Sequence, residues 1–339
     1  MTQRVHSIGV IGGDGIGPEV TEAALEVVRA AGVVMTTEHF DLGAARYLRD
    51  GFVLDEATLE QLRGFDALML GAIGPAIGDT RIPGGTLERG LLLRLRFGLD
   101  LFINYRPFRG VAGSLAQGCD FAIVRENTEG PYAGEGGVLR RGTPYEVATQ
   151  GSVNTRFGVE RCVRYAFERA RHCARPKVTL VHKTNVLTFA GDLWSRVMTD
   201  VQSDYPDVEV DYHHVDAACI YLVEDPRRYS VIVTDNLFGD ILSDLAGAVT
   251  GGIGFAASGN INPTKTGASL FEPVHGAAHD IVGTNRANPL AAVSSAVLML
   301  EHLGEDEAAT RIARAVRDFE GDASILGTSG ITNQLLERL

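Results

Sequence analysis

The sequence predicts an α/β protein of about two domains, because 339 residues exceed the usual span of a single domain. Short β-branched runs alternate with longer amphipathic segments along the whole chain. The content of 45% hydrophobic and 7% aromatic residues is ordinary for a globular enzyme. We find no internal repeat, low-complexity tract or Pro/Ser linker. The two domains are therefore expected to share the chain through interleaved crossings rather than a flexible tether.

The first half of the chain carries three strand and three helix signals. Pro18 and Glu19 suit the first turn of a helix, and Asn154 is a candidate cap for a later one. The segment 104–107 is expected to break the third helical pattern. We predict strands at residues 7–11, 67–70 and 121–125, and helices at 18–31, 87–102 and 154–171.

The second half continues the alternation. A β-branched run at residues 231–233 is followed by helical periodicity after Asn236, and glycine-rich loops are expected at 83–85 and 251–259. We predict strands at residues 177–181, 208–214 and 231–233, and helices at 192–202, from 236 onward, 289–303 and 306–319.

Charge and cysteine usage exclude several classes of protein. A formal net charge of −12 argues against a nucleic-acid partner, which needs clustered Lys and Arg. None of the 4 cysteines forms a CxxC pair, and Cys219, in an apolar strand-like run, is interpreted as a reduced structural thiol. The sequence has no signal-peptide pattern and no apolar run of about 18 residues. We therefore expect a cytoplasmic protein without membrane contact.

Two aspartates form the most informative local pattern. Asp240 and Asp244 lie four residues apart, on one face of the predicted helix that follows a buried strand. A solvated helix face is the ordinary interpretation of such a pair. Here, however, the flanking residues are apolar, and buried acids need a partner. Converging carboxylates at the carboxyl end of a strand predict a hard divalent cation.

The glycine-rich first turn resembles a dinucleotide fingerprint only in part. Residues 12–19, GGDGIGPE, follow a strand and open a helix, but the third glycine is misplaced and Pro18 occupies the helix start. The match to a Rossmann turn is weak, and a tight turn that uses glycine for positive φ is the preferred interpretation of the pattern.

Three arginines are candidate binding groups for a carboxylate ligand. Arg96 and Arg106 flank a short helix-to-loop segment, and Arg125 ends a predicted strand. The planar guanidinium matches a carboxylate, although each arginine by itself is more commonly a surface charge. Together with the two metal-binding acids, they suit a dicarboxylate that chelates a cation.

Seven motifs in order resemble the β-decarboxylating dehydrogenases, a family that includes isocitrate, isopropylmalate, homoisocitrate and tartrate enzymes. They are GDGIGPEV (13–20), NYRP (104–107), VRENTEGPYAG (124–134), VHKTNVL (181–187), VDAACI (215–220), TDNLFGDILSDL (234–245) and FEPVHGAAHDIVG (271–283). The resemblance implies a fold that is not Rossmann, with two α/β domains sharing a central mixed sheet. It implies a cofactor domain of residues 1–101 plus 254–339, and a substrate, metal and dimerisation domain of residues 102–253.

The resemblance also implies roles for individual residues in a homodimer with shared active sites. Arg96, Arg106 and Arg125 would bind the malate carboxylates, and Lys183 of the partner subunit and Tyr132 would handle protons. Asp240 and Asp244 would hold Mg²⁺ or Mn²⁺ together with Asp216 of the partner, which would also contact the substrate. The implied cofactor is NAD, contacted by Ile16, Gly74, Glu88, Asn185, His275, Gly276, Ala277, Asp280 and Asn288.

The substrate is predicted from an apolar pocket of Leu91, Leu92 and a partner's Val186, which favours an isopropyl group on C3 over a carboxylate. The expected reaction is NAD-dependent oxidative decarboxylation of 3-isopropylmalate to 4-methyl-2-oxopentanoate, in leucine biosynthesis. Arg89 and Arg94 leave open another 3-substituted malate, such as homoisocitrate, tartrate or an alkylmalate of specialised metabolism. A catalytically silent regulatory subunit is a third hypothesis, disfavoured because every catalytic position is filled.

Overall fold

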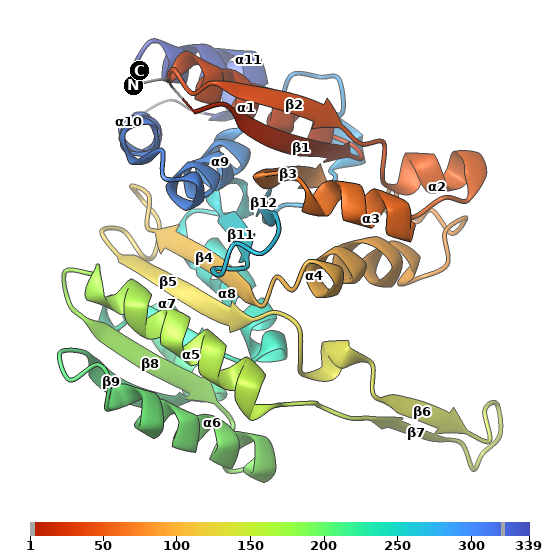
Figure 1. Ribbon diagram of the computed structural model, residues 1–339, viewed down its shortest axis with the longest axis vertical. Coiled ribbons are helices and arrows are strands. Elements are labelled where there is room, and N and C mark those ends of the chain that lie inside the picture. The colour runs from red at the N-terminus through yellow and green to blue at the C-terminus, as the bar shows by residue number, and fades with distance from the viewer. Residues whose placement is uncertain (1–3, 320–322) are drawn as a thin grey trace. The chain divides into compact units, whose positions relative to one another are not determined.

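The computed structural model describes residues 4–319 and 323–339. The chain divides into two compact units, the first of Met1–Leu101 with Gly252–Leu339 and the second of Phe102–Gly251. The first unit thus combines both ends of the chain, and the second is formed by its middle (Figure 1). The second crossing lies at Gly252, two residues before the position 254 expected from the sequence.

The first unit contains five strands in the order β2-β1-β3-β12-β11. Neighbours are parallel except for β11 and β12, which pair antiparallel. The strands are β1 (His6–Gly13), β2 (Met35–His39), β3 (Ala67–Ala72), β11 (Ala257–Ile261) and β12 (Ser269–Pro273).

Helices cover both faces of these strands. Every residue of β3 is buried, and its Leu68 and Leu70 share a core cluster with leucines of α3 and α4. Helices α1 and α9 also pack against the sheet, as expected where parallel strands are buried on both sides. The helices are α1 (Gly17–Ala30), α2 (Ala44–Asp50), α3 (Glu56–Arg63), a π-helix (Glu88–Leu93), α4 (Arg94–Gly98), α9 (Leu290–Leu303), α10 (Asp306–Arg317) and α11 (Ala323–Leu336).

The second unit has its own five strands, in the order β4-β5-β10-β8-β9. Only the β4–β5 pair is antiparallel, so the carboxyl ends of β5, β10, β8 and β9 share one edge. The strands are β4 (Ile103–Arg109), β5 (Asp120–Glu126), β8 (Lys177–His182), β9 (Glu209–His214) and β10 (Val231–Thr234).

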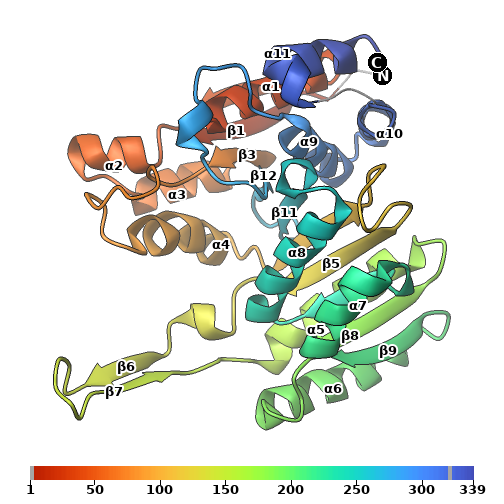
Figure 2. The ribbon, with the colours of Figure 1, turned by 180° about the vertical axis from the view of Figure 1, so that it is seen from behind.

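Two helix pairs cover the faces of the second unit. Helices α5 (Arg156–Arg171) and α6 (Thr188–Gln202) pack together on one face (Figure 1), and α7 (Val215–Glu224) and α8 (Asn236–Thr250) pack together on the other (Figure 2). An exposed antiparallel hairpin projects from this unit and consists of β6 (Gly136–Leu139) and β7 (Val147–Gln150).

The structure corrects several sequence predictions. The helical pattern does end before residues 104–107, but these residues lie within strand β4, where Pro107 is accommodated. Cys219 lies in helix α7 rather than in a strand, because an apolar run of this length does not distinguish the two. Thr155, not Asn154, caps α5 by accepting the N–H of Gly158 at 2.9 Å. Helix α4 ends at Gly98, and strand β11 begins inside the glycine-rich loop expected at 251–259. The elements without a predicted counterpart are β2, β4, β6, β7, β11, β12, α2, α3, α7 and α11.

All four cysteines are free thiols. Within residues 4–319 and 323–339, no helix is both long and apolar enough to cross a membrane.

Candidate functional site

Helix α8 places Asp240 and Asp244 on one face, one turn apart, as the sequence predicted. The helix begins directly after buried β10, and Asp235 caps it by accepting the N–H of Phe238 at 2.7 Å. Both side chains retain solvent exposure, 41% for Asp240 and 68% for Asp244. The expectation that both acids are buried is therefore wrong, and their carboxylates are accessible to a ligand.

Arg125 connects β5 to helix α8. Its side chain is almost fully buried, with Nη1 at 2.5 Å from Asp240 Oδ1 and Nε donating to Asn236 Oδ1 at 3.0 Å. Gly239 permits this packing, since a Cβ there would lie 2.4 Å from Arg125 Cγ. The arginine is thus held in one place by the helix that carries the aspartates.

Arg106 approaches the same helix from the neighbouring strand β4. It is 6% exposed, and its Nη1 donates to Ser243 Oγ at 2.6 Å. Its guanidinium lies 4.0 Å from Asp240 and 3.8 Å from Asp244. The two predicted carboxylate-binding arginines and the two aspartates therefore form one cluster.

Tyr132 completes this cluster. Its hydroxyl donates to Asp240 Oδ2 at 2.9 Å, and the Arg125 guanidinium lies 5.2 Å from the centre of its ring. Tyr132 belongs to a short 3₁₀ turn, Pro131–Ala133, that follows β5. A hydroxyl group able to give a proton thus lies beside the proposed ligands of a metal.

Lys183 and Asp216 form a separate pair in the second unit. The Lys183 ammonium lies 2.7 Å from Asp216 Oδ1, and this hydrogen bond lowers the pKa of the Asp216 carboxyl. Lys183 follows β8 directly, and Asp216 lies in the first turn of α7. In the described part of this single chain, no three His, Cys, Asp or Glu side chains gather to hold a metal.

The predicted cofactor residues of the first unit lie on loops that contact one another. The N–H of Ile16 donates to Ala277 O at 2.8 Å, and His279 Nε2 lies 2.8 Å from Gly74 O. Gly15, at φ +60°, is required there because a Cβ would lie 1.8 Å from Ala277 O. Positions 16, 74 and 277 are thus held together.

Asp14 is a structural residue of this loop cluster that the sequence analysis did not single out. Its buried carboxylate accepts the N–H groups of Ala44, Ala45 and Gly74 at 2.7, 3.0 and 2.9 Å. Its position in the glycine-rich turn was the available signal. Asn236 and Ser243, the partners of the two arginines, were also missed.

The remaining predicted residues are dispersed. Arg96, in the first unit, lies 3.5 Å from Glu272 Oε1. Burial lowers the pKa of His275, whose Nδ1 lies 3.0 Å from Gly276 O, and Asn288 accepts the N–H of Leu290. The other cofactor candidates are Glu88 in the π-helix, Asn185 after β8, and exposed Asp280 in the turn His279–Ile281.

The predicted apolar pocket is only partly accessible. Leu91 is 0% exposed and belongs to the core of the first unit, where Leu92 packs against the same cluster. Leu91 is therefore corrected from a lining residue to a core residue, because the π-helix turns its side chain inward. Val186 is 65% exposed and remains available to a ligand or a partner.

The donor set fits a hard divalent cation. Asp240 and Asp244 offer accessible carboxylate oxygens, the ligand type that Mg²⁺ and Mn²⁺ prefer. The loop cluster around Ile16 and Gly74 lies at the carboxyl ends of β1 and β3, where α/β sheets bind nucleotides.

Known proteins are similar to this chain over nearly its whole length. The family profile of isocitrate/isopropylmalate dehydrogenases matches residues 7–324. A 3-isopropylmalate dehydrogenase of Mycobacterium avium (strain 104) is 59% identical over 317 residues, which cover 92% of this chain and 93% of that protein. The enzyme of the same name from Clavibacter sepedonicus is 53% identical over 349 residues, 99% of this chain and 98% of that protein.

Solved structures of known enzymes have the same fold as this chain. The isocitrate dehydrogenase of Methylococcus capsulatus superposes with a TM-score of 0.87 at 38% identity, covering 98% of this chain and 99% of that one. A β-decarboxylating dehydrogenase of Thermococcus kodakarensis gives 0.81 at 35% identity, over 98% of this chain and 96% of that one. The predicted mixed α/β fold and the predicted family are thus confirmed. This chain belongs to the isocitrate/isopropylmalate dehydrogenase family.

Proposed function

We propose that this protein is an NAD-dependent 3-isopropylmalate dehydrogenase, which oxidises and decarboxylates 3-isopropylmalate to 4-methyl-2-oxopentanoate in leucine biosynthesis. The main structural support for this proposal is the cluster of side chains on and around helix α8, formed by Arg106, Arg125, Tyr132, Asp240 and Asp244. Relatives named for this activity, at 53% and 59% identity, support the choice of substrate. The proposed setting is the cytoplasm.

The arginines would orient the substrate. Arg106 and Arg125 are buried and fixed by hydrogen bonds, so they can bind carboxylates without first becoming ordered. Arg96 is the third arginine that the family resemblance assigns to the same ligand. Asp240 and Asp244 would hold Mg²⁺ or Mn²⁺, with Asp216 contributed by the partner of a homodimer. When bound, the cation would polarise the C2 oxygen while NAD accepts the hydride from C2.

Two side chains would move the protons. Lys183, as the neutral amine, would take the proton of the C2 hydroxyl as the hydride leaves, and its contact with Asp216 at 2.7 Å can orient it. Loss of CO₂ then leaves an electron pair that must be protonated at C3. Tyr132, fixed by Asp240, would supply that proton.

A second candidate is the same chemistry on another 3-substituted malate. It is favoured by the burial of Leu91, which removes one predicted contact to an isopropyl group. Against it, Arg94 is paired with Glu56 at 3.2 Å and is not directed to an extra carboxylate.

NADH production on a panel of 3-isopropylmalate, isocitrate, homoisocitrate and tartrate separates the two candidate functions. We expect kcat/KM for 3-isopropylmalate to exceed that for isocitrate by at least ~100-fold; comparable values would favour the second candidate.

The proposed cofactor preference rests on Asp280. A carboxylate at this position can accept hydrogen bonds from the ribose hydroxyls of NAD and would repel the 2′-phosphate of NADP. NADP-dependent members of the family carry Lys-Tyr where this chain has Asp280-Ile281. The double change Asp280→Lys, Ile281→Tyr should reduce kcat/KM with NAD and raise it with NADP. If the unmodified protein uses both cofactors equally well, Asp280 does not determine the preference.

A further inference from the structure

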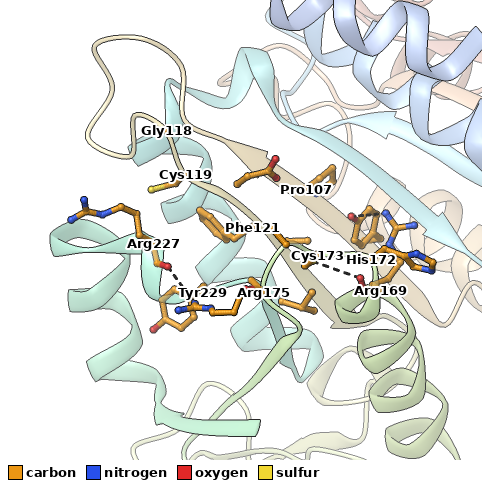
Figure 3. A pocket seen from close by; sticks show the side chains of 16 residues that line it. Pro107, Gly118, Cys119, Phe121, Arg169, His172, Cys173, Arg175, Arg227 and Tyr229 are labelled. Carbon is orange, nitrogen blue, oxygen red and sulfur yellow. Dashed lines mark hydrogen bonds between the residues drawn. The ribbon is translucent and has the colours of Figure 1, made fainter. Parts of the chain in front are cut away.

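A cavity of about 580 Å³ lies in the second unit at the sheet edge opposite to the site described above (Figure 3). It is lined by the start of β5 at Asp120, the start of β10 at Val231 and the carboxyl end of α5. Arg125 lies five residues further along β5, roughly 17 Å away at the usual rise of a strand. No residue assigned above to substrate, metal or cofactor lines this cavity.

The cavity is basic, in a chain whose net charge is −12. Arg169, Arg175 and Arg227 line it, and His172 adds a group that can be protonated. Asp120 is the one carboxylate in its lining and is already paired with Arg109, at 2.5 Å. Arg227 is paired with Asp225, which lies outside the lining, at 2.8 Å, and the lining itself still has more basic than acidic side chains.

Two of the arginines are held in place by the chain around them. Arg175 Nη2 donates to the carbonyl oxygens of Arg227 and Arg228 at 3.3 and 2.5 Å. Arg227 Nε donates to Asp225 at 2.8 Å. A guanidinium has five N–H donors, so each of these two retains donors for a ligand.

The end of helix α5 does not account for this charge. Basic residues in a last helical turn commonly offset the helix dipole, which explains Arg169. Arg175 and Arg227, however, lie beyond the helix, in the segments before β8 and β10. The carbonyls of Arg169 and Ala170 near the end of α5 are also satisfied, since the N–H groups of His172 and Cys173 donate to them.

Two buried aromatic side chains form the floor of the cavity. Phe121 and Tyr229 are buried, and their ring centres lie 6.5 Å apart. The Tyr229 hydroxyl is directed away to His213 Nδ1 at 3.0 Å, so the tyrosine presents its ring rather than a polar group. A ligand would therefore meet arginine donors above an apolar base.

We propose that this cavity is a binding site for a phosphate group, recognised by Arg175 and Arg227 and separate from the active site. Guanidinium groups pair with phosphate, as with carboxylate, through parallel N–H···O bonds, and the larger negative charge of a phosphate suits a site with two arginines. The volume exceeds that of a lone phosphate and lies within the range of small-molecule sites. The bound group is thus inorganic phosphate or the phosphate of a small monoester.

The test is calorimetric titration of the full-length protein with inorganic phosphate and, in parallel, glycerol 3-phosphate, at an ionic strength kept constant with NaCl. We compare the wild type, the double variant Arg175→Gln, Arg227→Gln, and Arg156→Gln as control. Arg156 is likewise an exposed arginine of the second unit, but it pairs with Asp200 away from the cavity. The wild type should bind phosphate with a Kd of about 1 mM, a value typical of a few charged hydrogen bonds.

The double variant should weaken this binding at least about tenfold, because two charge-assisted donors are removed. The control should leave the Kd unchanged. Arg227→Gln alone should give a smaller loss, and it keeps the test valid if the double variant melts early, since its side chain is 75% exposed. Equal Kd values in the wild type and the double variant, or an equal loss in the control, would overturn the proposal. Tighter binding of glycerol 3-phosphate than of phosphate identifies a monoester as the ligand.

Discussion

Asp240 is the residue on which the most site contacts converge. Arg125 and Tyr132 each contact one of its carboxylate oxygens, and Arg106 lies 4.0 Å away. A single carboxylate therefore contacts both a proposed carboxylate-binding group and a proposed proton donor, while 41% of its side chain remains exposed. Removing the charge of Asp240 would disturb its contacts with Arg106, Arg125 and Tyr132 at once.

We expect Asp240→Asn to reduce kcat/KM at least ~1000-fold, the scale seen when a preorganised charged group is lost from an active site. NADH formation with 3-isopropylmalate and added Mg²⁺ measures this effect. Asp192→Asn is the matched control, since Asp192 is an exposed partner of Arg196 on α6. Treatment with EDTA should likewise abolish the activity of the wild type. Full activity of protein verified to be metal-free would contradict the metal assignment.

A second residue pair lies buried behind the site. His182 is fully buried between Trp194 and Phe238, and its Nε2 lies 3.5 Å from Asp235 Oδ2. Burial lowers the pKa of His182 to about 4 and raises the pKa of Asp235 to about 6. The histidine is therefore neutral at pH 7. For Asp235, the loss of solvation in the buried site opposes ionisation of the carboxyl group.

The two residues should shift acid stability in opposite directions. His182 binds its proton less readily in the folded state, so its contribution to stability is lost as the pH falls from about 6.5 to about 4. In His182→Gln, the free energy of unfolding should fall less between pH 7 and pH 5 than in the wild type, by up to about 2 kcal/mol. Asp235 binds its proton more readily when folded, so Asp235→Asn should increase the fall. Urea unfolding at both pH values measures each difference, and identical pH profiles for all three proteins would refute the assignment.

Helix α8 is the element that organises the site. Asp235 caps the helix directly after β10, and the middle of the helix carries the two aspartates. Gly239 leaves room for the Arg125 side chain. Strands β4 and β5 bring the two arginines to it from adjacent positions in the sheet. The site therefore depends on the close approach of this helix to the sheet as much as on the charged groups.

Gly239→Ala tests that approach directly. The new Cβ would lie 2.4 Å from Arg125 Cγ, so the arginine or the helix must move. We expect a loss of about 1–3 kcal/mol in the free energy of unfolding, as is usual for overpacking, together with a large rise in KM. Gly84→Ala is the control, because a Cβ there meets nothing within 4 Å. An unchanged KM in Gly239→Ala would show that Arg125 does not bind the substrate.

At the scale of the whole molecule, one chain does not bring all the proposed ligands together. Asp216 pairs with Lys183, and no cluster of three metal-binding side chains occurs in residues 4–319 and 323–339. The same unit exposes apolar side chains after β8 and on α6, α7 and α8: Val186, Leu187, Phe189, Ile220, Val223, Leu237 and Ile241. Such a surface suits a second copy of the chain.

Subunit mixing tests the proposed shared site. Lys183→Met and Asp240→Asn should each be inactive alone. Random exchange between the two should restore about a quarter of wild-type activity, because half of the dimers are mixed and each has one intact site of two. Mixing two preparations of Lys183→Met provides the control. Absence of recovery, with exchange proven by mass spectrometry, would place each active site within one subunit.

The sequence by itself determined the α/β alternation, the helix that carries Asp240 and Asp244, and the family. These follow from local periodicity and from ordered motifs, which need no knowledge of distant contacts. The sequence also placed Arg106 and Arg125 among the binding candidates, and both lie at helix α8.

Only the tertiary structure decided which side chains meet. Pro107 lies inside strand β4 because pairing with β5 overrides local propensity. Leu91 is a core residue because the π-helix turns it inward, and Cys219 is helical because packing, not an apolar run, selects its conformation. The buried carboxylate of Asp14, the pair of His182 with Asp235 and the arginine-lined cavity join segments far apart in the chain. Local sequence patterns cannot reveal such contacts, because they arise only when the sheet brings distant residues to the same edge.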